Sequence, residues 1–481
     1  MKQMNKRVQP HKNGQPQAES VERRPSNKGN SGQTTGSGTQ RPPTTSRGLD
    51  RIREAAKKDP ALKFTNLMHH ITTDLLSEAY RGLNPKAAAG ADEVTWDEYG
   101  EGLEERLQVV HELVQSGTYR ARPSKRVYIS KPDGRKRPIG IAALEDKIVQ
   151  QALVWVLQSI YEVDFKGYNY GFRPGRGQHH ALDAIYVAIT QRKVNYVLDA
   201  DIRNYFDTLD HEWLMKFLEH RVGDSRVLRL VRKFLRAGVS EDGKWSKTVV
   251  GTPQGAVISP LLANIYLHYV LDLWADWWRR RRARGEVYIV RYADDFVMGF
   301  QYRADAERLL RELKERLVKF NLELHEEKTR LIEFGRFAEE DREKDGKGKP
   351  ETFDFLGFTH ICSKKRNGKF KLRRKTMGKR ARAKLHEVRT QLKSNIHRSV
   401  MDTGKWLRSV FQGHLNYYGV PGNRNATGAF RTELAKAWLH SLRRRSQKGQ
   451  SMTWVKFCRY FSIWIPSVCT VHPYPNERLR V

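Results

Sequence analysis

The segment VYIVRYADDFVMGF, residues 287–300, decides the fold of this chain. Two apolar runs, 287–292 and 296–300, flank two adjacent acids, so the spacing predicts a β-hairpin with Asp294 and Asp295 at its tip. A solvated turn is the simpler explanation of paired Asp residues, but such a turn usually recruits Gly or Asn. The strand-like residues on both sides therefore favour carboxylates held at the end of two buried strands.

A second apolar run also ends in acids. Residues 194–202 predict a buried strand that presents Asp199 and Asp201 at its end. Carboxylates at the ends of neighbouring strands repel one another unless cations bind between them. Mg²⁺ prefers such oxygen ligands, and two metal ions about 3.5–4 Å apart can serve phosphoryl transfer. The acids therefore point to a two-metal site for nucleotidyl transfer.

Composition limits the classes of protein that fit. The chain has 481 residues, with 88 Lys and Arg against 54 Asp and Glu, a net charge of +34. Hydrophobic residues make up 39% of it, which predicts two or three folded domains. Its three cysteines form no CxxC pair, which excludes a disulfide scaffold and fits a reducing compartment. No apolar run approaches eighteen residues, so no membrane span is expected.

The positive charge is concentrated near the C-terminus. Residues 1–50 carry 9 basic and 3 acidic side chains, residues 51–360 carry 51 and 47, and residues 361–481 carry 28 and 4. The net charges are therefore +6, +4 and +24. Solubility would explain a scattered surplus, whereas a surplus confined to one region favours a nucleic-acid surface.

The remaining pattern predicts an α+β body followed by a basic helical tail. Residues 1–48 lack an apolar period and are expected to form a disordered arm. Residues 127–130 and 138–141 predict a basic hairpin around a Pro-Asp-Gly turn. The other predicted elements are helices at 214–235, 261–278 and 304–320, a charged loop at 339–349, a strand at 353–361 and helices after about residue 375.

Several blocks of the chain resemble one family, in the family's order. Tyr292-Ala-Asp-Asp295 resembles the YxDD box of reverse transcriptases, and Asp201-Ile-Arg-Asn-Tyr-Phe-Asp207 resembles their first carboxylate box. The further matching blocks are Lys131-Pro-Asp-Gly-Arg-Lys-Arg-Pro-Ile-Gly140, Tyr170-Gly-Phe-Arg-Pro-Gly175, Gly251-Thr-Pro-Gln-Gly255, Ser259-Pro-Leu-Leu-Ala-Asn264, Leu324-His-Glu-Glu-Lys-Thr329, Phe355-Leu-Gly-Phe358, Gly413-His-Leu-Asn-Tyr-Tyr-Gly419 and His472-Pro-Tyr-Pro475. Over residues 60–481 the chain is similar to the reverse transcriptases of bacterial group II introns.

The resemblance implies a right-hand polymerase fold, with fingers, a palm built on an antiparallel sheet, and a helical thumb. The implied division is a basic arm at 1–48, an N-terminal extension and fingers at 49–190, a palm with some fingers elements at 191–362, and a thumb or maturase domain at 363–481. It also implies an enzyme that copies RNA into DNA and assists the splicing and mobility of its intron. The implied partners are group II intron RNA, an RNA template, a DNA primer, target DNA and dNTPs, in the bacterial cytoplasm. The oligomeric state stays open.

The resemblance assigns the chemistry to three aspartates. Asp201, Asp294 and Asp295 would bind two Mg²⁺ ions, with Mn²⁺ as a substitute, and Asp294 is the stronger catalytic candidate of the adjacent pair. Ile202 would offer its backbone carbonyl to the metal on the nucleotide side.

Further residues would surround the nucleotide. Lys131 and Arg137 would clamp the triphosphate, since Arg suits bidentate phosphate contact, but each alone would be an ordinary basic turn residue. Phe206 would lie under the deoxyribose and exclude a 2′-hydroxyl, with core packing as the alternative. Gln254 would contact the template or the nucleotide, and Gly255 would allow close backbone approach, with a simple turn as the alternative.

The primer and the RNA would be held elsewhere. Lys328 would line the palm near the primer, and Leu356 with Gly357 would form the primer grip. A solvated Lys at a helix end is an equally good explanation of Lys328. In the tail, charge runs alternate with aromatic residues, and the cations would form the RNA surface. The proposed RNA-binding residues are Lys379, Arg380, Arg382, Arg443, Arg444 and Arg445.

One departure from the family bears on mobility. Many group II intron proteins carry a DNA-binding segment and a Cys/His endonuclease after the thumb, and no such cluster occurs up to Val481. A form without the endonuclease would need its primer from elsewhere, such as a replication fork. Two rival functions stay open: a reverse transcriptase domesticated for defence or diversification, and a non-catalytic RNA-binding splicing factor.

Overall fold

The computed structural model describes residues 47–130, 136–241, 244–246, 250–252 and 255–478. Among the expected features, Lys131, Gln254 and nearly all of the basic arm lie outside the described residues. For Arg137 only the backbone is described. Among the helices of the described ranges, none combines the length and apolar character that crossing a bilayer requires.

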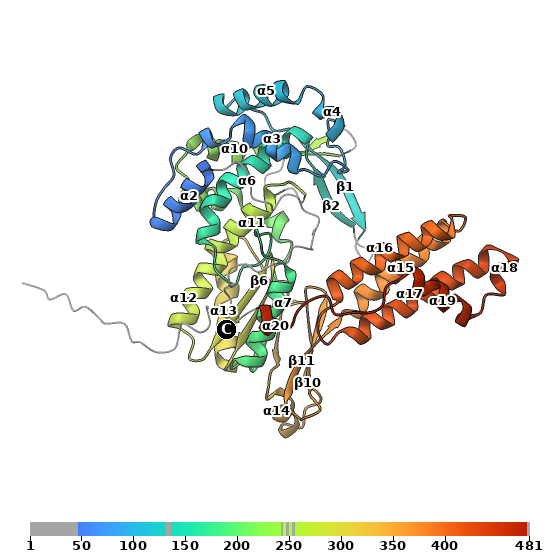
Figure 1. The fold of residues 1–481 in the computed structure, drawn as a ribbon. Coiled ribbons are helices and arrows are strands. Elements are labelled where there is room, and N and C mark those ends of the chain that lie inside the picture. Colours follow the sequence, from blue (N-terminus) through green and yellow to red (C-terminus); the bar gives the residue numbers. More distant parts are fainter. Residues whose placement is uncertain (1–46, 131–135, 242–243, 247–249, 253–254, 479–481) are drawn as a thin grey trace, which may run out of the picture.

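The N-terminal part of the body is a helical layer around α6 (Leu144–Asp164), in which every residue from Ile148 to Tyr161 is buried. Helices α2 and α3 pack against α6, and α5 packs on α3 (Figure 1). Their apolar stripes share one core with α6 because residues three and four apart fall on one helix face. The remaining bounds here are α2 (Arg47–Lys58), η2 (Met68–His70), α3 (Thr73–Gly82), α4 (Trp96–Gly100) and α5 (Leu103–Ser116).

The predicted basic hairpin is present. Strands β1 (Ser124–Ser130) and β2 (Lys136–Ile141) pair antiparallel, with Ile129 opposite Arg137. A short strand β4 (Val239–Glu241) runs parallel to β1, and β5 (Lys244–Ser246) pairs with β4. The sheet order is β2-β1-β4-β5.

A second, antiparallel sheet contains the acidic hairpin. Its order is β6-β7-β3-β8, formed by β6 (Val287–Tyr292), β7 (Asp295–Phe300), β3 (Tyr196–Asp201) and β8 (Arg330–Glu333). Alternate residues enter two different cores: Leu198 packs with α6 and its neighbours, whereas Val197 packs with α7 (Gln178–Gln191). Both faces of the sheet are therefore covered, which explains its continuous apolar runs.

Two helices predicted as single units are interrupted. Residues 214–235 form α9 (His211–Glu219) and α10 (Ser225–Arg236), because the Asp224 side chain caps α10 by accepting from the backbone of Arg226 at 2.9 Å. The helix predicted at 261–278 runs as α11 (Ser259–Leu267), a π-helical turn η3 (His268–Asp272) and α12 (Leu273–Arg281). A π turn adds a residue and rotates the side chains of the next helical turn.

Two further predictions of local structure are wrong. The predicted charged loop contains helix α14 (Ala338–Lys344), and the strand predicted at 353–361 is a hairpin of β9 (Phe353–Phe355) and β10 (Phe358–Lys364). Strand β11 (Phe370–Thr376), for which the sequence predicts no element, extends this sheet and ends where the expected helices begin. The remaining body helices are α8 (Tyr205–Thr208) and α13 (Arg303–Val318).

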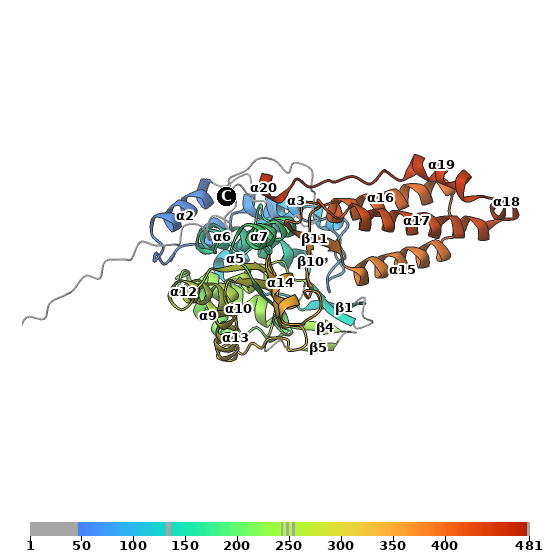
Figure 2. The same cartoon turned by 90° about the horizontal axis from the view of Figure 1, so that it is seen from below.

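The last part of the chain is a helical bundle with its own core. It projects from the body, and the segment after α19 runs back along it to α20, which lies on α7 (Figure 1, Figure 2). The bundle is attached to the body both where β11 ends and where α20 docks. Its helices are α15 (Gly378–Ser394), α16 (Val400–Tyr418), α17 (Arg424–Arg445), α18 (Gln447–Gln450) and α19 (Trp454–Trp464), followed by α20 (Pro475–Arg478).

Candidate active site

The predicted acidic hairpin brings its carboxylates to the end of β3. Strands β6 and β7 are joined by a two-residue turn, Ala293 and Asp294, and Asp295 lies directly opposite Asp201 in the β3–β7 register. Alternation along β3 puts Asp199 and Asp201 on one face of the sheet. Asp201, Asp294 and Asp295 are therefore neighbours.

The charges of these acids act on one another. Burial, followed by the charges of Asp294 and Asp201, raises the pKa of Asp295 from 3.8 to about 7. The Asp295 side chain nevertheless reaches solvent, so water weakens the part of this rise that comes from burial, and the like charges remain. Burial also raises the pKa of Asp199 to about 6, against the opposing effect of Arg330 at 3.6 Å. The site carries an excess of carboxylate charge.

Lys328 offsets part of this excess. Its ammonium group forms an ion pair with the Asp201 carboxylate, although the side chain is 53% exposed. The sequence places Lys328 near the primer, and in the structure its described contact is with the predicted metal site. The end of β3 is fixed by the backbone, since His325 donates to the Asp201 carbonyl at 2.8 Å and Ile202 pairs with Leu324.

The donor set fits a hard divalent cation. Crowded carboxylates that raise one another's pKa are relieved by positive charge, and carboxylate oxygens are the ligands that Mg²⁺ prefers. Within the ranges that the structure describes, no three acidic, His or Cys side chains already lie in a metal-binding arrangement.

The turn of the acidic hairpin has an unusual backbone. Ala293 has a φ of 59°, in the left-handed region that residues with a Cβ rarely adopt. Its carbonyl accepts a hydrogen bond at 3.0 Å from the guanidinium of Arg291. Arg291 is fully buried and forms two hydrogen bonds, at 2.8 and 2.5 Å, with the buried carboxylate of Asp272 in η3.

A neighbouring block supports the same turn. A Cβ on Gly171 would collide with the backbone nitrogen of Ala293, so only Gly fits at this position. Asn264 donates to the Gly171 carbonyl at 2.7 Å and accepts from Arg291 at 3.1 Å. The two sequence blocks that contain Gly171 and Asn264 therefore both pack behind the acidic hairpin and stabilise its turn.

The loop predicted at the template lies beside Phe206. The backbone of Thr252 donates to the Phe206 carbonyl at 2.8 Å, and Gly251 packs against the same carbonyl. On the other side, Gly255 has a φ of 115° and lies against Gly140 of β2. The loop therefore connects the first carboxylate block with the basic hairpin, and the half-buried Phe206 side chain lies at that junction.

The predicted primer grip lies where the body meets the helical bundle. Leu356 and Gly357 form the β9–β10 turn, with φ values of 46° and 82°. Tyr417 of α16 donates to the Leu356 carbonyl at 2.8 Å, and a Cβ on Gly357 would approach Arg380 of α15 to 3.0 Å. Arg380 therefore lies beside Leu356 and Gly357, the predicted primer grip.

The other proposed RNA-binding cations divide into two groups. Lys379 and Arg382 are exposed on α15, and Arg444 is exposed on α17. Arg443 and Arg445 are exposed too, but they donate to the carbonyls of Met452 and Arg398. These two arginines therefore also stabilise the bundle.

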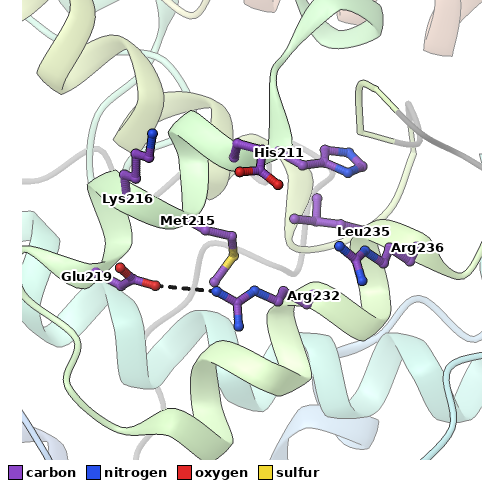
Figure 3. A pocket seen from close by; sticks show the side chains of 8 residues that line it. His211, Met215, Lys216, Glu219, Arg232, Leu235 and Arg236 are labelled. Atoms are coloured by element: carbon purple, nitrogen blue, oxygen red, sulfur yellow. Dashed lines mark hydrogen bonds and ion pairs between the residues drawn. The ribbon is translucent and has the colours of Figure 1, made fainter.

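A cavity of about 240 Å³ lies between α9 and α10, in a part of the body without the three aspartates (Figure 3). Figure 3 shows Arg232 and Arg236 of α10 facing residues of α9, with Arg232 bonded to Glu219. We assign no chemistry to it. Its lining residues are His211, Glu212, Met215, Lys216, Glu219, Arg232, Leu235 and Arg236.

Sequence reasoning missed the residues behind the hairpin. Arg291 and Asp272 each lie in an otherwise apolar segment, where a buried charge needs a partner. The need of a buried charge for a partner was therefore a signal in the sequence. It does not identify which residue pairs with which, because Arg291 and Asp272 lie on different elements. The sequence predicts Asp199 as an acid at a strand end and assigns it no role in the site.

Comparison with known proteins identifies the family of the chain. Residues 129–360 match the family model described as reverse transcriptase (RNA-dependent DNA polymerase). The chain is 37% identical over 277 residues to Protein YkfC of Escherichia coli, covering 50% of this chain and 72% of that protein. It is 35% identical over 231 residues to the group II intron-encoded protein LtrA of Lactococcus lactis, covering 47% of this chain and 38% of LtrA.

A third relative is the uncharacterized 91 kDa protein in cob intron of Schizosaccharomyces pombe, 38% identical over 165 residues, which cover 34% of this chain and 20% of that protein. The chain belongs to the reverse transcriptase family, the RNA-directed DNA polymerases. Within that family it is similar to the group II intron-encoded protein LtrA, and its α+β architecture is the right-hand polymerase fold.

Proposed function

We propose that the chain copies RNA into DNA by two-metal nucleotidyl transfer at Asp201, Asp294 and Asp295. One observation carries the proposal: the β3–β7 register sets Asp201 opposite Asp295, beside Asp294, so that their charges raise the pKa of Asp295. Two Mg²⁺ ions, or Mn²⁺ in their place, would activate the primer 3′-hydroxyl and stabilise the leaving oxygen. Ile202 would add its backbone carbonyl, and Lys328 would compete with metal for Asp201.

The chain's own residues would then position the substrates. Lys131 and Arg137 would hold the triphosphate of the dNTP, and Phe206 would exclude a 2′-hydroxyl. Gln254 and Gly255 would contact the template. This arrangement is supported by the packing of Gly255 against the strand that contains Arg137 and by the contact of the same loop with Phe206.

The primer and the RNA would lie toward the bundle. Leu356 and Gly357 would grip the primer, and the adjacent cations of α15 would bind phosphates. We further propose that this basic surface binds group II intron RNA, assists its splicing and, with target DNA, its mobility. The name of LtrA supports this proposal, and a bacterial cytoplasmic setting follows from it.

Primer extension tests the polymerase proposal directly. On poly(rA)/oligo(dT) with Mg²⁺, the wild-type chain should extend the primer. Asp294→Asn should reduce extension to the level of a reaction without protein, because it removes a metal-binding carboxylate, while RNA binding stays nearly unchanged. DNA synthesis by the variant would exclude the proposed metal site.

A splicing assay with the host intron RNA, run beside primer extension, tests the second activity. Splicing that depends on the chain and survives Asp294→Asn would support a maturase function that is separate from synthesis. DNA synthesis without any effect on splicing would favour a domesticated reverse transcriptase. Splicing without DNA synthesis would favour the non-catalytic splicing factor.

A further inference from the structure

We propose that Asp272 and Arg291 are positioning residues that set the conformation of the Ala293–Asp294 turn and thereby the metal affinity of the aspartates. The proposal rests on the proposed function, because it concerns the same three aspartates. It assigns a role to a buried ion pair that touches neither the nucleotide nor the metal.

The ion pair lies behind the hairpin. Arg291 is opposite Phe296, and Tyr292 is opposite Asp295, so alternation puts Arg291 on the face away from Asp295. Its partners on that face are Asp272 and Asn264, both buried. Among the contacts of the described residues, Arg291 therefore reaches the site through the backbone, by its bond to the Ala293 carbonyl.

That bond fixes the orientation of one peptide unit. Ala293 has a positive φ, a conformation that persists only where the surroundings hold it. The guanidinium of Arg291 holds the carbonyl from one side, and Gly171 packs against the amide nitrogen from the other. The next residue is Asp294. The orientation of this peptide therefore sets the direction in which the Asp294 side chain leaves the backbone.

The π turn explains how Asp272 reaches Arg291. Each residue of an α-helix is rotated by about 100° about the helix axis from the one before it. The extra residue of η3 therefore places the Asp272 side chain on a different side of the helix from the one it would have in an unbroken continuation of α11. Tyr168 donates to the Asp272 backbone carbonyl at 2.5 Å and fixes this end of the turn. Loss of the Asp272 carboxylate should therefore free Arg291 to leave Ala293.

The test compares Asp272→Asn with Asp276→Asn. The second change removes a buried carboxylate of α12, about one turn further along, from its ion pairs with Lys166, Arg279 and Arg280. Mn²⁺ binding is measured by the electron paramagnetic resonance of free Mn²⁺, and amide exchange of residues 287–300 is measured without metal. Asp272→Asn should weaken Mn²⁺ binding about 10–100-fold and speed exchange at the turn. Asp276→Asn should leave both unchanged. Equal effects of the two variants would overturn the proposal.

A double variant separates positioning from stability. Asp272→Leu with Arg291→Met removes both buried charges and keeps the apolar volume, which often preserves folding. It also removes the bond to Ala293, so Mn²⁺ binding should stay weak although the chain is folded. Mn²⁺ binding restored to the wild-type level would show that the ion pair only stabilises the fold. Neither readout requires DNA synthesis, so failure of the proposed polymerase activity would be seen separately.

Discussion

At the residue scale, the Phe206 side chain has two alternative roles, packing in the core and selection of the nucleotide, and one substitution can distinguish them. The ring is half-buried and makes an edge contact with Tyr205 at 5.5 Å between centroids. Phe206→Val should admit ribonucleotides, because a smaller side chain leaves room for a 2′-hydroxyl. Single-nucleotide incorporation with dNTPs and rNTPs checks this. A lower melting temperature with unchanged discrimination would assign Phe206 to packing alone.

Asp295 should make the stability of the metal-free protein depend on pH. Its pKa is raised from 3.8 to about 7, so the folded state retains a proton that the unfolded state has lost. The carboxyl therefore costs stability increasingly from about pH 4 to pH 7, and the cost stays level above pH 7. Asp295→Asn should be more stable than wild type by a margin that grows over this range.

Urea denaturation in EDTA at several pH values measures that margin. The Asp199→Asn variant is a useful comparison, since the pKa of Asp199 is raised only to about 6 and Arg330 is its partner. Its margin should level off at a lower pH. A margin for Asp295→Asn that is constant from pH 4 to pH 9 would contradict the like-charge account.

At the scale of elements, helix α15 offers a charge test with a control on the same helix. Changing Lys379, Arg380 and Arg382 to Gln should flatten the salt dependence of RNA binding by about 0.7–0.9 of log-log slope per lost phosphate contact. The control is Lys384→Gln with Arg389→Gln, since these cations already pair with Glu387 and Glu433. Binding of a labelled RNA at several salt concentrations measures the slope, and equal slopes for both variants would place the RNA surface elsewhere.

The elements that were predicted correctly are those with an uninterrupted pattern. The β6–β7 hairpin follows from two apolar runs, and β1–β2 follows from the Pro-Asp-Gly turn. Strand β11 was missed because its buried positions alternate as Leu372, Arg374 and Thr376, and a buried Arg hides the period. Arg374 is buried only because Asp183 of α7 binds it at 2.8 Å, a contact between residues far apart in sequence.

In the candidate site, too, contacts between residues far apart in sequence could not be predicted. The three aspartates were predicted to lie together, and the register of β3 and β7 brings them together. The contact of Lys328 with Asp201 and the pair of Arg291 with Asp272 depend on how separate elements pack. No local pattern contains that information, so the supporting residues could be suspected but not paired.

At the scale of the whole molecule, Asp183 connects the body to both ends of the bundle. It lies on α7, bonds Arg374 of β11 and forms an ion pair at 3.2 Å with Arg478 of α20. Asp183→Asn leaves the buried Arg374 and the largely buried Arg478 uncompensated and should lower the free energy of unfolding by about 3–5 kcal/mol. Urea denaturation measures this loss, and limited proteolysis should detect release of α20.

The control for that prediction is Asn476→Ala, which removes only an exposed hydrogen bond between Asn476 and Gln191. It should change the free energy of unfolding by less than about 0.5 kcal/mol, as surface substitutions usually do. Equal losses for the two variants would mean that Asp183 does not hold the two attachments.

The double attachment of the bundle limits how it can move. A rigid part joined to its neighbour at a single point can tilt in any direction, whereas one joined at two points can only swing about the line between them. The bundle leaves the body after β11, and the chain returns to the body at α20 (Figure 2). Because Tyr417 of α16 also bonds the Leu356 carbonyl and packs against the body core, any swing should be small, and the bundle should keep nearly one orientation on the body.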